Sequence, residues 1–524
     1  MPPAALTLAS LVDHARANGG AGIRYNVGAD WKTKTFREFA NDVDDFANAL
    51  TRMGVGPRQR VGIMSENRYE WVVCDLAVQQ LGCVSVCFPV EEMAARPLSE
   101  LADTYGLALL VTSARALFRR RPEHWVLNLD GVTTGVSARA VPPLDPEGVC
   151  SLAFSSGTAG RLKCLRMAAR GAEATIELAA RRWGLRSDDR TLIALPLSTF
   201  QQRLIVYASI WLGSTMVLTD SPKLFAAIQE GAPTVVIGPP ALYQVFEARF
   251  NALPAPVRAA LRAAAAWARL LPLRVLRGRA LKRLFRPFYA ALGGAPRVLI
   301  TGSAPSRRST LLFFRLVGLP LLEAYGITEG GVIAANAPDG CRLGSVGRPL
   351  EAGTVRLAAD GEVLFRPRFP QSVGYVDDAS EQASTFLTDG SIATGDLGRF
   401  DDDGFLYLIG RKRDTIVTRA GYKFHPAPIE AQAAATPGVG RAVIIGGGDL
   451  DLCCLVVEPE QAGDEARRRE LERRMKARVA DLNRTLPGPA RLARVVVATE
   501  RFSVENGLLT RNLKVDRQAV ARKF

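Results

Sequence analysis

Short apolar runs alternate with helix-like spans over most of the chain, and this alternation limits the folds that are open to it. Apolar residues recur at helical spacing over 36–53 and 70–80, and each span is followed by a run typical of a buried strand. Such runs lie at 61–64, 84–88, 148–155, 192–195, 234–237 and 298–301. Strands that alternate with helices form parallel sheets covered by helices. The sequence therefore predicts parallel α/β architecture.

A different pattern begins near residue 340, where short strands separated by turns replace the alternation. This stretch predicts a β-rich subdomain. The C-terminal part has strands near 442–447 and 452–457, a charged helix over 464–483 and a strand over 493–498. The predicted fold class is α/β, with a large N-terminal domain of parallel-sheet and β-rich subdomains and a small α+β C-terminal domain.

The composition is that of an ordinary globular protein, with 48% hydrophobic and 23% charged residues among 524. The eight cysteines include no pair of CxxC motifs, which argues against a disulfide scaffold or a structural zinc site and favours a reducing compartment. Only three histidines are present, which is little material for a His-ligated metal. No targeting pattern is visible, and the longest apolar stretch, 204–218, is too short to span a bilayer. We expect a soluble, cytoplasmic protein.

Positive charge is concentrated in one segment. The net charge is +15, and residues 257–288 hold nine Arg or Lys and no acid. The charges are interleaved with apolar residues, as in one or two basic amphipathic helices broken near Pro272 and Gly278. A solvated helical face, contact with an anionic membrane surface and nucleic-acid binding are the three interpretations. We predict no nucleic-acid partner, because no base-reading motif accompanies the charge.

One turn has the composition of a phosphate-binding loop. Phe154-Ser-Ser-Gly-Thr-Ala-Gly-Arg-Leu-Lys163 places glycines, hydroxyls and a lysine directly after a predicted strand. Glycine lets backbone N–H groups approach phosphate oxygens, and Ser155, Ser156 and Thr158 add hydroxyl donors. Lys163 adds a positive charge. The spacing differs from that of a Walker loop, and a surface turn is the alternative for this motif taken alone.

Four further motifs carry polar residues suited to a nucleotide. In Glu323-Ala-Tyr-Gly-Ile-Thr-Glu329 the tyrosine can stack on a base, and Thr328 with Glu329 offers oxygen ligands for Mg²⁺. In Ala393-Thr-Gly-Asp396 a carboxylate can accept from both hydroxyls of a ribose. The other two are Gly410-Arg-Lys-Arg-Asp-Thr-Ile-Val-Thr-Arg-Ala-Gly421 and Glu505-Asn-Gly-Leu-Leu-Thr-Arg-Asn-Leu-Lys514. Each motif taken alone is better explained as a turn or a salt-bridged surface.

The order and spacing of these five motifs resemble those of the adenylate-forming superfamily of acyl-CoA synthetases, peptide-synthetase adenylation domains and luciferases. The resemblance runs from Thr35 to Lys514. It is nearest to the long-chain fatty acyl-CoA synthetases, whose signatures resemble residues 65–71, 292–305 and 504–514. It implies an N-terminal domain over 1–410 that binds ATP and the acyl substrate, and a mobile lid domain over 411–524 that carries a catalytic lysine.

The resemblance also implies two half-reactions and a role for each motif. A carboxylate attacks the α-phosphate of Mg²⁺-ATP to give acyl-AMP and pyrophosphate, and the thiol of CoA, a co-substrate, then displaces AMP. By this resemblance, the β- and γ-phosphates are bound by Ser155, Ser156, Gly157, Thr158, Gly160 and Lys163, and the adenine is framed by Gly302, Ser303, Ala304, Glu323, Ala324, Tyr325 and Gly326. The α-phosphate and magnesium are bound by Thr328 and Glu329, and the ribose by Asp396 and Arg411. The reacting carboxylate is contacted by Lys514, and the hinge between the domains is Arg413.

The chain departs from the family pattern at a few positions. Leu162 and Cys164 replace the proline and the last glycine of the phosphate loop, which puts the path and closure of the loop in question. Thr199 stands where the long-chain branch has a histidine near the acyl gate, so a shifted substrate preference is expected. Arg511 and Asn512 replace Pro-Thr near the C-terminal lysine. Because the acidic, arginine and lysine residues assigned above remain, we predict an active enzyme.

The predicted function is an acid–thiol ligase that activates a medium- or long-chain fatty acid with ATP and transfers the acyl group to CoA. One alternative is a fatty acyl-AMP ligase that loads an acyl carrier protein. That branch carries an insertion near residues 350–394, which are short here, and this favours CoA. The other alternative is a catalytically weak lipid-binding homologue, which only the altered phosphate loop supports. We expect a cytoplasmic location, with 257–288 as a candidate peripheral contact at the inner face of the membrane.

Overall fold

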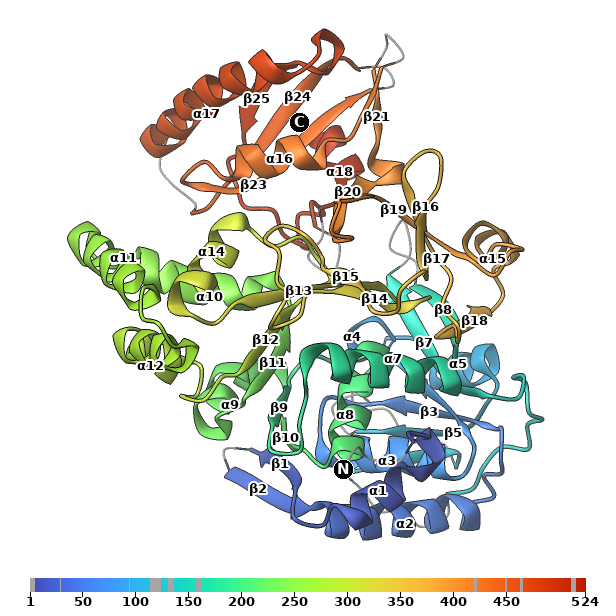
Figure 1. Cartoon of the computed structure of the whole chain (residues 1–524). Coiled ribbons are helices and arrows are strands. Elements are labelled where there is room, and N and C mark those ends of the chain that lie inside the picture. The colour runs from blue at the N-terminus through green and yellow to red at the C-terminus, as the bar shows by residue number, and fades with distance from the viewer. Residues whose placement is uncertain are drawn as a thin grey trace.

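A computed structural model describes residues 5–28, 30–93, 95–113, 124–130, 136–156, 162–418, 422–447, 450–461, 465–509 and 515–524. Several residues singled out by the sequence lie outside these ranges, namely Gly157, Thr158, Gly160, Arg511, Asn512 and Lys514. The described chain forms a large body of two sheets and their helices, with a smaller C-terminal body above it (Figure 1).

The first sheet has seven strands within the described residues. In spatial order they are β18 (Ser372–Tyr375), β8 (Leu162–Ala168), β7 (Val149–Ser156), β4 (Val84–Cys87), β3 (Arg60–Met64), β5 (Leu107–Thr112) and β6 (Val126–Asn128). The strands from β7 to β6 run parallel, whereas β8 turns back along β7. The parallel sheet predicted from the alternating pattern is confirmed.

The second sheet has nine strands in the part of the chain that is described. Their order is β15 (Arg348–Pro349), β14 (Gly331–Ala335), β13 (Leu321–Ile327), β12 (Val298–Thr301), β11 (Val235–Gly238), β9 (Arg190–Ile193), β10 (Thr215–Leu218), β1 (Gly22–Val27) and β2 (Asp30–Thr35). The strands from β13 to β1 are parallel, and both edges are antiparallel.

Helices cover both faces of each sheet. From Leu109 onward the residues of β5 alternate between two cores, because successive side chains of a strand point to opposite faces: Leu109 and Val111 pack between the sheets, and Leu110 packs on the outside. The inner layer holds η1 (Leu8–Ser10), α1 (Leu11–Ala17), α2 (Phe36–Arg52), α3 (Tyr69–Gln80), α7 (Ala169–Trp183) and α8 (Phe200–Leu212). The outer face of the first sheet carries α4 (Val90–Met93) and α5 (Leu98–Tyr105).

The outer face of the second sheet carries η3 (Ser221–Lys223), α9 (Leu224–Gly231), α10 (Pro240–Asn251), α11 (Ala255–Arg269), α12 (Arg274–Leu284), α13 (Arg286–Ala291) and α14 (Arg308–Val317). The predicted break at Pro272 is present, since Pro272 lies in the turn between α11 and α12. The predicted break at Gly278 is wrong, because Gly278 lies inside α12. A helix tolerates an interior glycine at a cost of about 1 kcal/mol, so glycine alone does not end it.

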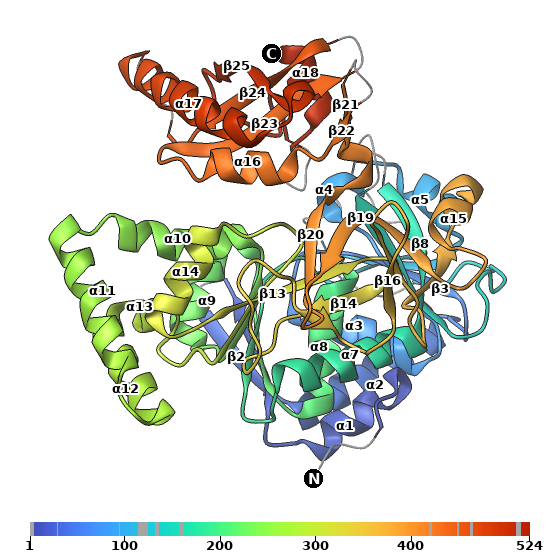
Figure 2. The same ribbon diagram turned by 45° about the horizontal axis from the view of Figure 1, so that its top comes forward.

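The remaining elements form the β-rich part and the C-terminal body. The first is an antiparallel sheet with one helix: β16 (Val355–Leu357), β17 (Glu362–Phe365), β19 (Ile392–Phe400), β20 (Leu406–Arg411) and α15 (Ala379–Thr385). The second follows η4 (Lys412–Asp414) and contains β21 (Ile416–Val417), β22 (Lys423–Phe424), α16 (Ala427–Ala434), β23 (Val439–Gly447), β24 (Leu450–Pro459), α17 (Glu465–Thr485), η5 (Gly488–Ala490), β25 (Leu492–Val497) and α18 (Arg517–Lys523). Figure 2 shows the C-terminal body covering one end of the large body.

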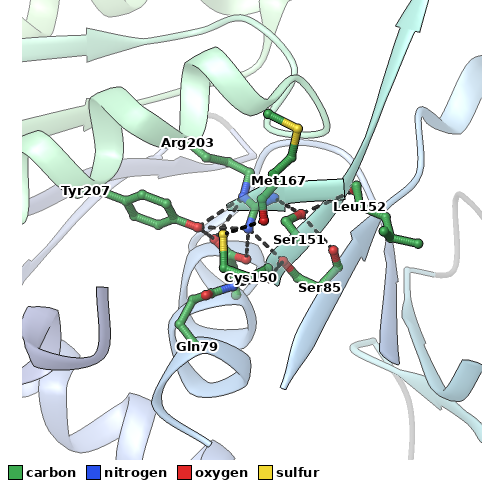
Figure 3. Close-up of polar contacts among 9 residues, drawn as sticks. Gln79, Ser85, Cys150, Ser151, Leu152, Met167, Arg203 and Tyr207 are labelled. Carbon is green, nitrogen blue, oxygen red and sulfur yellow. Dashed lines mark hydrogen bonds and ion pairs between the residues drawn. The ribbon is translucent and has the colours of Figure 1, made fainter. Parts of the chain in front are cut away.

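A buried ion pair ties the inner helices to the strand that leads into the phosphate loop. On α8, Arg203 donates from Nη2 to Oδ1 of Asp75 on α3 at 2.6 Å. Its Nη1 donates to Oγ of Ser151 on β7 at 2.6 Å (Figure 3). Tyr207 donates to the other oxygen of Asp75 at 2.6 Å. The two charged side chains are 1% and 2% exposed. This cluster fixes α8 to β7.

Among the described helices, none combines the length and the apolar character that crossing a membrane requires.

Candidate active site

The first part of the site forms where two parallel strands of the second sheet end. Residues 302–304 follow β12, and 323–326 lie in the neighbouring β13, which pairs Thr301 with Glu323. Ser303 has φ 67°, a conformation that a non-glycine residue rarely adopts and that marks a strained turn. At Gly326 a Cβ would lie 2.2 Å from the carbonyl oxygen of Gly331, so this close approach requires glycine.

Asp396 is held by two partners from different strands. Strands β19 and β20 pair it directly with Arg411, whose Nε lies 2.8 Å from Asp396 Oδ1. Tyr325 donates to Asp396 Oδ2 at 2.7 Å. Burial, with the adjacent carboxylate, raises the pKa of Tyr325, so the phenol stays a neutral donor. The structure therefore joins the predicted base-side tyrosine and the predicted ribose residues in one cluster.

Glu362 connects Gly395, next to Asp396, with Lys412, the neighbour of the residue predicted to be a hinge. Its Oε1 accepts from the backbone N–H of Gly395 at 2.9 Å, and its Oε2 lies 2.7 Å from Lys412 Nζ. Arg413 follows in η4, with a side chain that is 58% exposed. Glu362 could not be recognised from local sequence, because its two partners lie 33 and 50 residues away.

Lys163 and Glu329 meet across an aromatic side chain that the sequence analysis missed. Tyr375, in β18, donates to Glu329 Oε1 at 2.7 Å, and Lys163 Nζ lies 5.6 Å from the centre of the Tyr375 ring. Lys163 also forms an ion pair with Glu381 on α15. Burial lowers the pKa of Lys163. Both Tyr375 and Glu381 are more than 200 positions from Lys163 in sequence, so no local pattern could reveal them.

The departures in the phosphate loop fall on a regular strand. Leu162 and Cys164 lie in β8, where the pairing with β7 matches Ser156 to Leu162, Ser155 to Lys163 and Phe154 to Cys164. The two flanks of residues 157–161 are therefore held together as a β-hairpin, and Cys164 packs against the outer core of the first sheet. The flanks of the loop close without the proline and glycine that the family pattern has.

One cavity of about 3610 Å³ contains these parts, and it lies between the large body and the C-terminal body. Its lining includes every residue to which the sequence assigns a contact and whose side chain the structure describes. The C-terminal body contributes Arg441, Arg501 and Arg517, and also Leu509 and Val515, which bracket residues 510–514. Arg307, which directly precedes α14, donates to the carbonyl of Gly440 at 2.7 Å and so connects the two walls.

Apolar residues of α7 and α8 line one part of this cavity, called here the apolar arm. The lining residues on each helix recur at three- and four-residue intervals, which places them on one face. They are Ile176, Ala179, Ala180 and Trp183 on α7, and Leu204, Ile205, Ala208 and Leu212 on α8. From Gln201 to Leu212 this face extends about 16 Å, at 1.5 Å per residue. Thr199, which replaces the family histidine, also lines the cavity at the start of α8.

The single carboxylate of Glu329 fits a magnesium ion that is bound partly by substrate, rather than a metal ion held only by protein side chains. In the described chain, no group of three or more His, Cys, Asp or Glu side chains is arranged to hold an ion. Protein sites usually bind Mg²⁺ through one or two carboxylates together with substrate phosphates. Glu329 provides one such carboxylate, fixed by Tyr375 at the cavity wall. The site therefore fits an ion that binds together with a polyphosphate.

Glu323 has an unusual ionisation. Burial raises the pKa of its carboxyl to about 7, partly offset by a backbone N–H donor from Gly344. Near neutral pH the Glu323 carboxyl at the cavity wall is therefore present in both its protonated and its ionised form.

Two family models match the chain. The model of AMP-binding enzymes matches residues 13–368, and the model of the AMP-binding enzyme C-terminal domain matches residues 413–524. The chain belongs to the AMP-binding enzyme family. This confirms the resemblance to adenylate-forming enzymes that the motifs indicate, and it shows that the chain is an enzyme.

Similar proteins support this membership of the AMP-binding enzyme family. The long-chain-fatty-acid–CoA ligase FadD15 of Mycobacterium tuberculosis is 30% identical over 94% of this chain and 91% of its own length. Among solved structures, the anthranilate CoA ligase AuaEII has a TM-score of 0.73 at 19% identity and covers 99% of this chain and 97% of its own. The amide bond synthetase McbA of Marinactinospora thermotolerans has a TM-score of 0.72 at 24% identity, covering 99% and 100%. The two structures confirm the predicted fold class.

Proposed function

We propose that this AMP-binding enzyme is an ATP-dependent acyl-CoA synthetase that activates a medium- or long-chain fatty acid. The observation that carries the substrate class is the apolar arm lined by α7 and α8. Three bonds of an extended chain advance about 3.6 Å, so an arm of about 16 Å accommodates roughly 13 bonds. The 30% identity to a long-chain-fatty-acid–CoA ligase supports the same class.

The site residues divide the work of the first half-reaction. Asp396, held by Tyr325 and Arg411, accepts from the ribose hydroxyls, and 302–304 with 323–326 frame the adenine. Thr328 and Glu329 face the α-phosphate, and Lys163, with the hydroxyls of Ser155 and Ser156 and residues 157–160, faces the outer phosphates. Mg²⁺, when bound, supplies positive charge to the phosphate oxygens. In such a transfer the protein contributes positioning and charge, so a preorganised cluster is what the chemistry requires.

The second half-reaction requires that the C-terminal body move. We place the domain boundary between residues 410 and 411, with Arg413 as the hinge and Lys514 as the lysine that serves adenylation. Leu509 and Val515 line the cavity on either side of residues 510–514, which supports this assignment. Rotation about η4 would withdraw this face and admit the thiol.

CoA is the proposed acceptor, and an acyl carrier protein is the alternative. Residues 350–394 form only short strands and α15, without the additional segment that the carrier-loading branch has at this place. A weak lipid-binding homologue is the less favoured alternative, since the flanks of the phosphate loop close in β7 and β8 despite the substitutions.

We place the enzyme in the cytoplasm, where segment 257–288 contacts the anionic inner face of the membrane. The nine basic residues and the lack of acids support this contact, because anionic lipid attracts such clusters.

Product analysis tests the proposal. Purified protein should form acyl-CoA from ATP, Mg²⁺, CoA and fatty acids, with higher kcat/KM for medium or long chains than for butyrate. Release of pyrophosphate with acyl transfer only to a holo acyl carrier protein would favour the alternative acceptor. Vesicle-free assays with dispersed acids keep this result independent of membrane binding.

A further inference from the structure

The turn between α11 and α12 exposes more apolar surface than any other described part of the chain. Trp267, Leu270, Leu273 and Val275 are 74%, 73%, 61% and 64% exposed, whereas no other large apolar side chain among the described residues exceeds 48%. Leu276 adds a fifth at 40%. The two helices form the left edge of the molecule in both views (Figures 1 and 2). A contiguous apolar tip of this kind marks an interaction site.

Basic residues stand directly behind this apolar tip. Arg279, Lys282 and Arg283 follow Val275 by four, seven and eight residues, so they lie on the same side of α12, and Arg286 begins α13. All four are exposed, and none forms an ion pair with a carboxylate of the described chain. Arg279, the first of these four cations, lies about 6 Å from Val275 along the helix, at 1.5 Å per residue. An interfacial helix buries its apolar face by about 5–10 Å, so tip and cations match the acyl and phosphate levels of a bilayer.

The shape of the tip is fixed by two other arginines. Arg277 donates to the carbonyls of Leu271 and Pro272 in the turn. Arg269 donates to the carbonyl of Arg315 at 2.7 Å and so attaches the end of α11 to α14. On the inner side, Leu281 and Phe285 are buried in the core of the large body. The apolar tip therefore projects from a rigid support, and Arg269 and Arg277 serve structure rather than a ligand.

We propose that this tip inserts into the headgroup region of an anionic bilayer, with residues 267–276 entering and Arg279, Lys282, Arg283 and Arg286 contacting lipid phosphates. A nucleic acid would satisfy the cations and leave the apolar tip in water, whereas a bilayer satisfies both. The inference deepens the membrane contact proposed above. Helix α10, whose Gln244, Val245 and Ala248 line the substrate cavity, precedes α11 and joins it at the end opposite the tip.

Vesicle flotation without substrates tests the insertion. Wild type should bind phosphatidylcholine vesicles containing phosphatidylglycerol and not vesicles of phosphatidylcholine alone. Trp267→Ser/Leu270→Ser/Leu273→Ser should weaken binding at least tenfold. Arg279→Gln/Lys282→Gln/Arg283→Gln should weaken it about fivefold per cation removed and flatten the salt dependence. Matched controls are Val27→Ser/Leu144→Ser/Val373→Ser for apolar exposure and Arg469→Gln/Arg473→Gln/Arg484→Gln for charge, and both should bind like wild type.

Three outcomes would overturn the proposal: equal binding of the tip variant and its control, equal binding to both kinds of vesicle, or a dimer in sedimentation velocity that only the tip variant loses. The last would assign the tip to self-association. Acyl-CoA formation from a dispersed acid should be the same in all variants. If neither wild type nor any variant forms acyl-CoA while wild type still binds anionic vesicles, the proposed function is rejected and the proposed membrane insertion is still supported.

Discussion

Glu323 lies at the cavity wall with a carboxyl whose pKa is raised to about 7 from an ordinary 4.5. The folded state therefore binds this proton more tightly than the unfolded state does, and stability falls as the pH rises from about 4.5 to 7. One pKa unit corresponds to about 1.4 kcal/mol, so a shift from 4.5 to about 7 makes the loss at most about 3–4 kcal/mol. Glu323→Gln should remove this component and gain stability relative to wild type above pH 7. Thermal midpoints measured across this range check it, and parallel profiles for the two proteins would contradict it.

Trp183 ends the α7 side of the apolar arm. Its side chain lines the cavity, and its indole N–H has no hydrogen-bond partner among the described residues. Trp183→Ala should lengthen the arm and raise kcat/KM for long relative to medium acids by about tenfold, the scale of pocket discrimination. Trp211→Ala is the matched control, since Trp211 is similarly buried but does not line the cavity. If both variants shift chain preference alike, the arm does not hold the acyl chain.

At the scale of elements, the Asp75–Arg203 pair decides how α3, α8 and β7 fit together. Removing one partner leaves a buried charge, so Asp75→Asn or Arg203→Met should each cost about 3–5 kcal/mol. The double variant should cost less than the sum, because the two side chains share one network. Denaturant unfolding measures all three. Asp389→Asn, which breaks the exposed pair with Arg356, should cost less than about 1 kcal/mol. Additive losses would show that the pair is not coupled.

Elements and motif positions could be predicted because their signals are local. The strands at 61–64 and 298–301 are short apolar runs, and the predicted contact residues follow such strands, so parallel packing brings them to one edge. The break at Gly278 was wrong because packing and neighbouring helix formers outweigh one glycine. The contacts of Tyr375 and Glu362, and the Asp75–Arg203 pair, could not be predicted, since each depends on residues brought together only by folding. The apolar faces of α7 and α8 can be recognised in the sequence from their helical periodicity. Periodicity does not distinguish a face that packs in the core from one that lines a cavity.

For the whole molecule, the account requires that the C-terminal body serve one half-reaction with Lys514. Lys514→Ala should slow adenylation by about 10² or more, which is about 3 kcal/mol, while CoA attack on supplied acyl-AMP persists. Lys523→Ala, at the end of α18, is a control that should leave both half-reactions unchanged. Single-turnover assays of each half-reaction separate the effects. Equal losses in both would assign Lys514 a structural role.

The central claim is that the cavity between the two bodies transfers AMP to a fatty acid. Fatty-acid-dependent exchange of labelled pyrophosphate into ATP tests this claim most directly, because it needs no thiol and no domain movement. We expect exchange with medium or long fatty acids and Mg²⁺, and a loss of about tenfold or more in Asp396→Asn, which weakens a charge-assisted contact to the ribose. Exchange that is absent with every carboxylic acid, or unchanged by this substitution, would contradict the account.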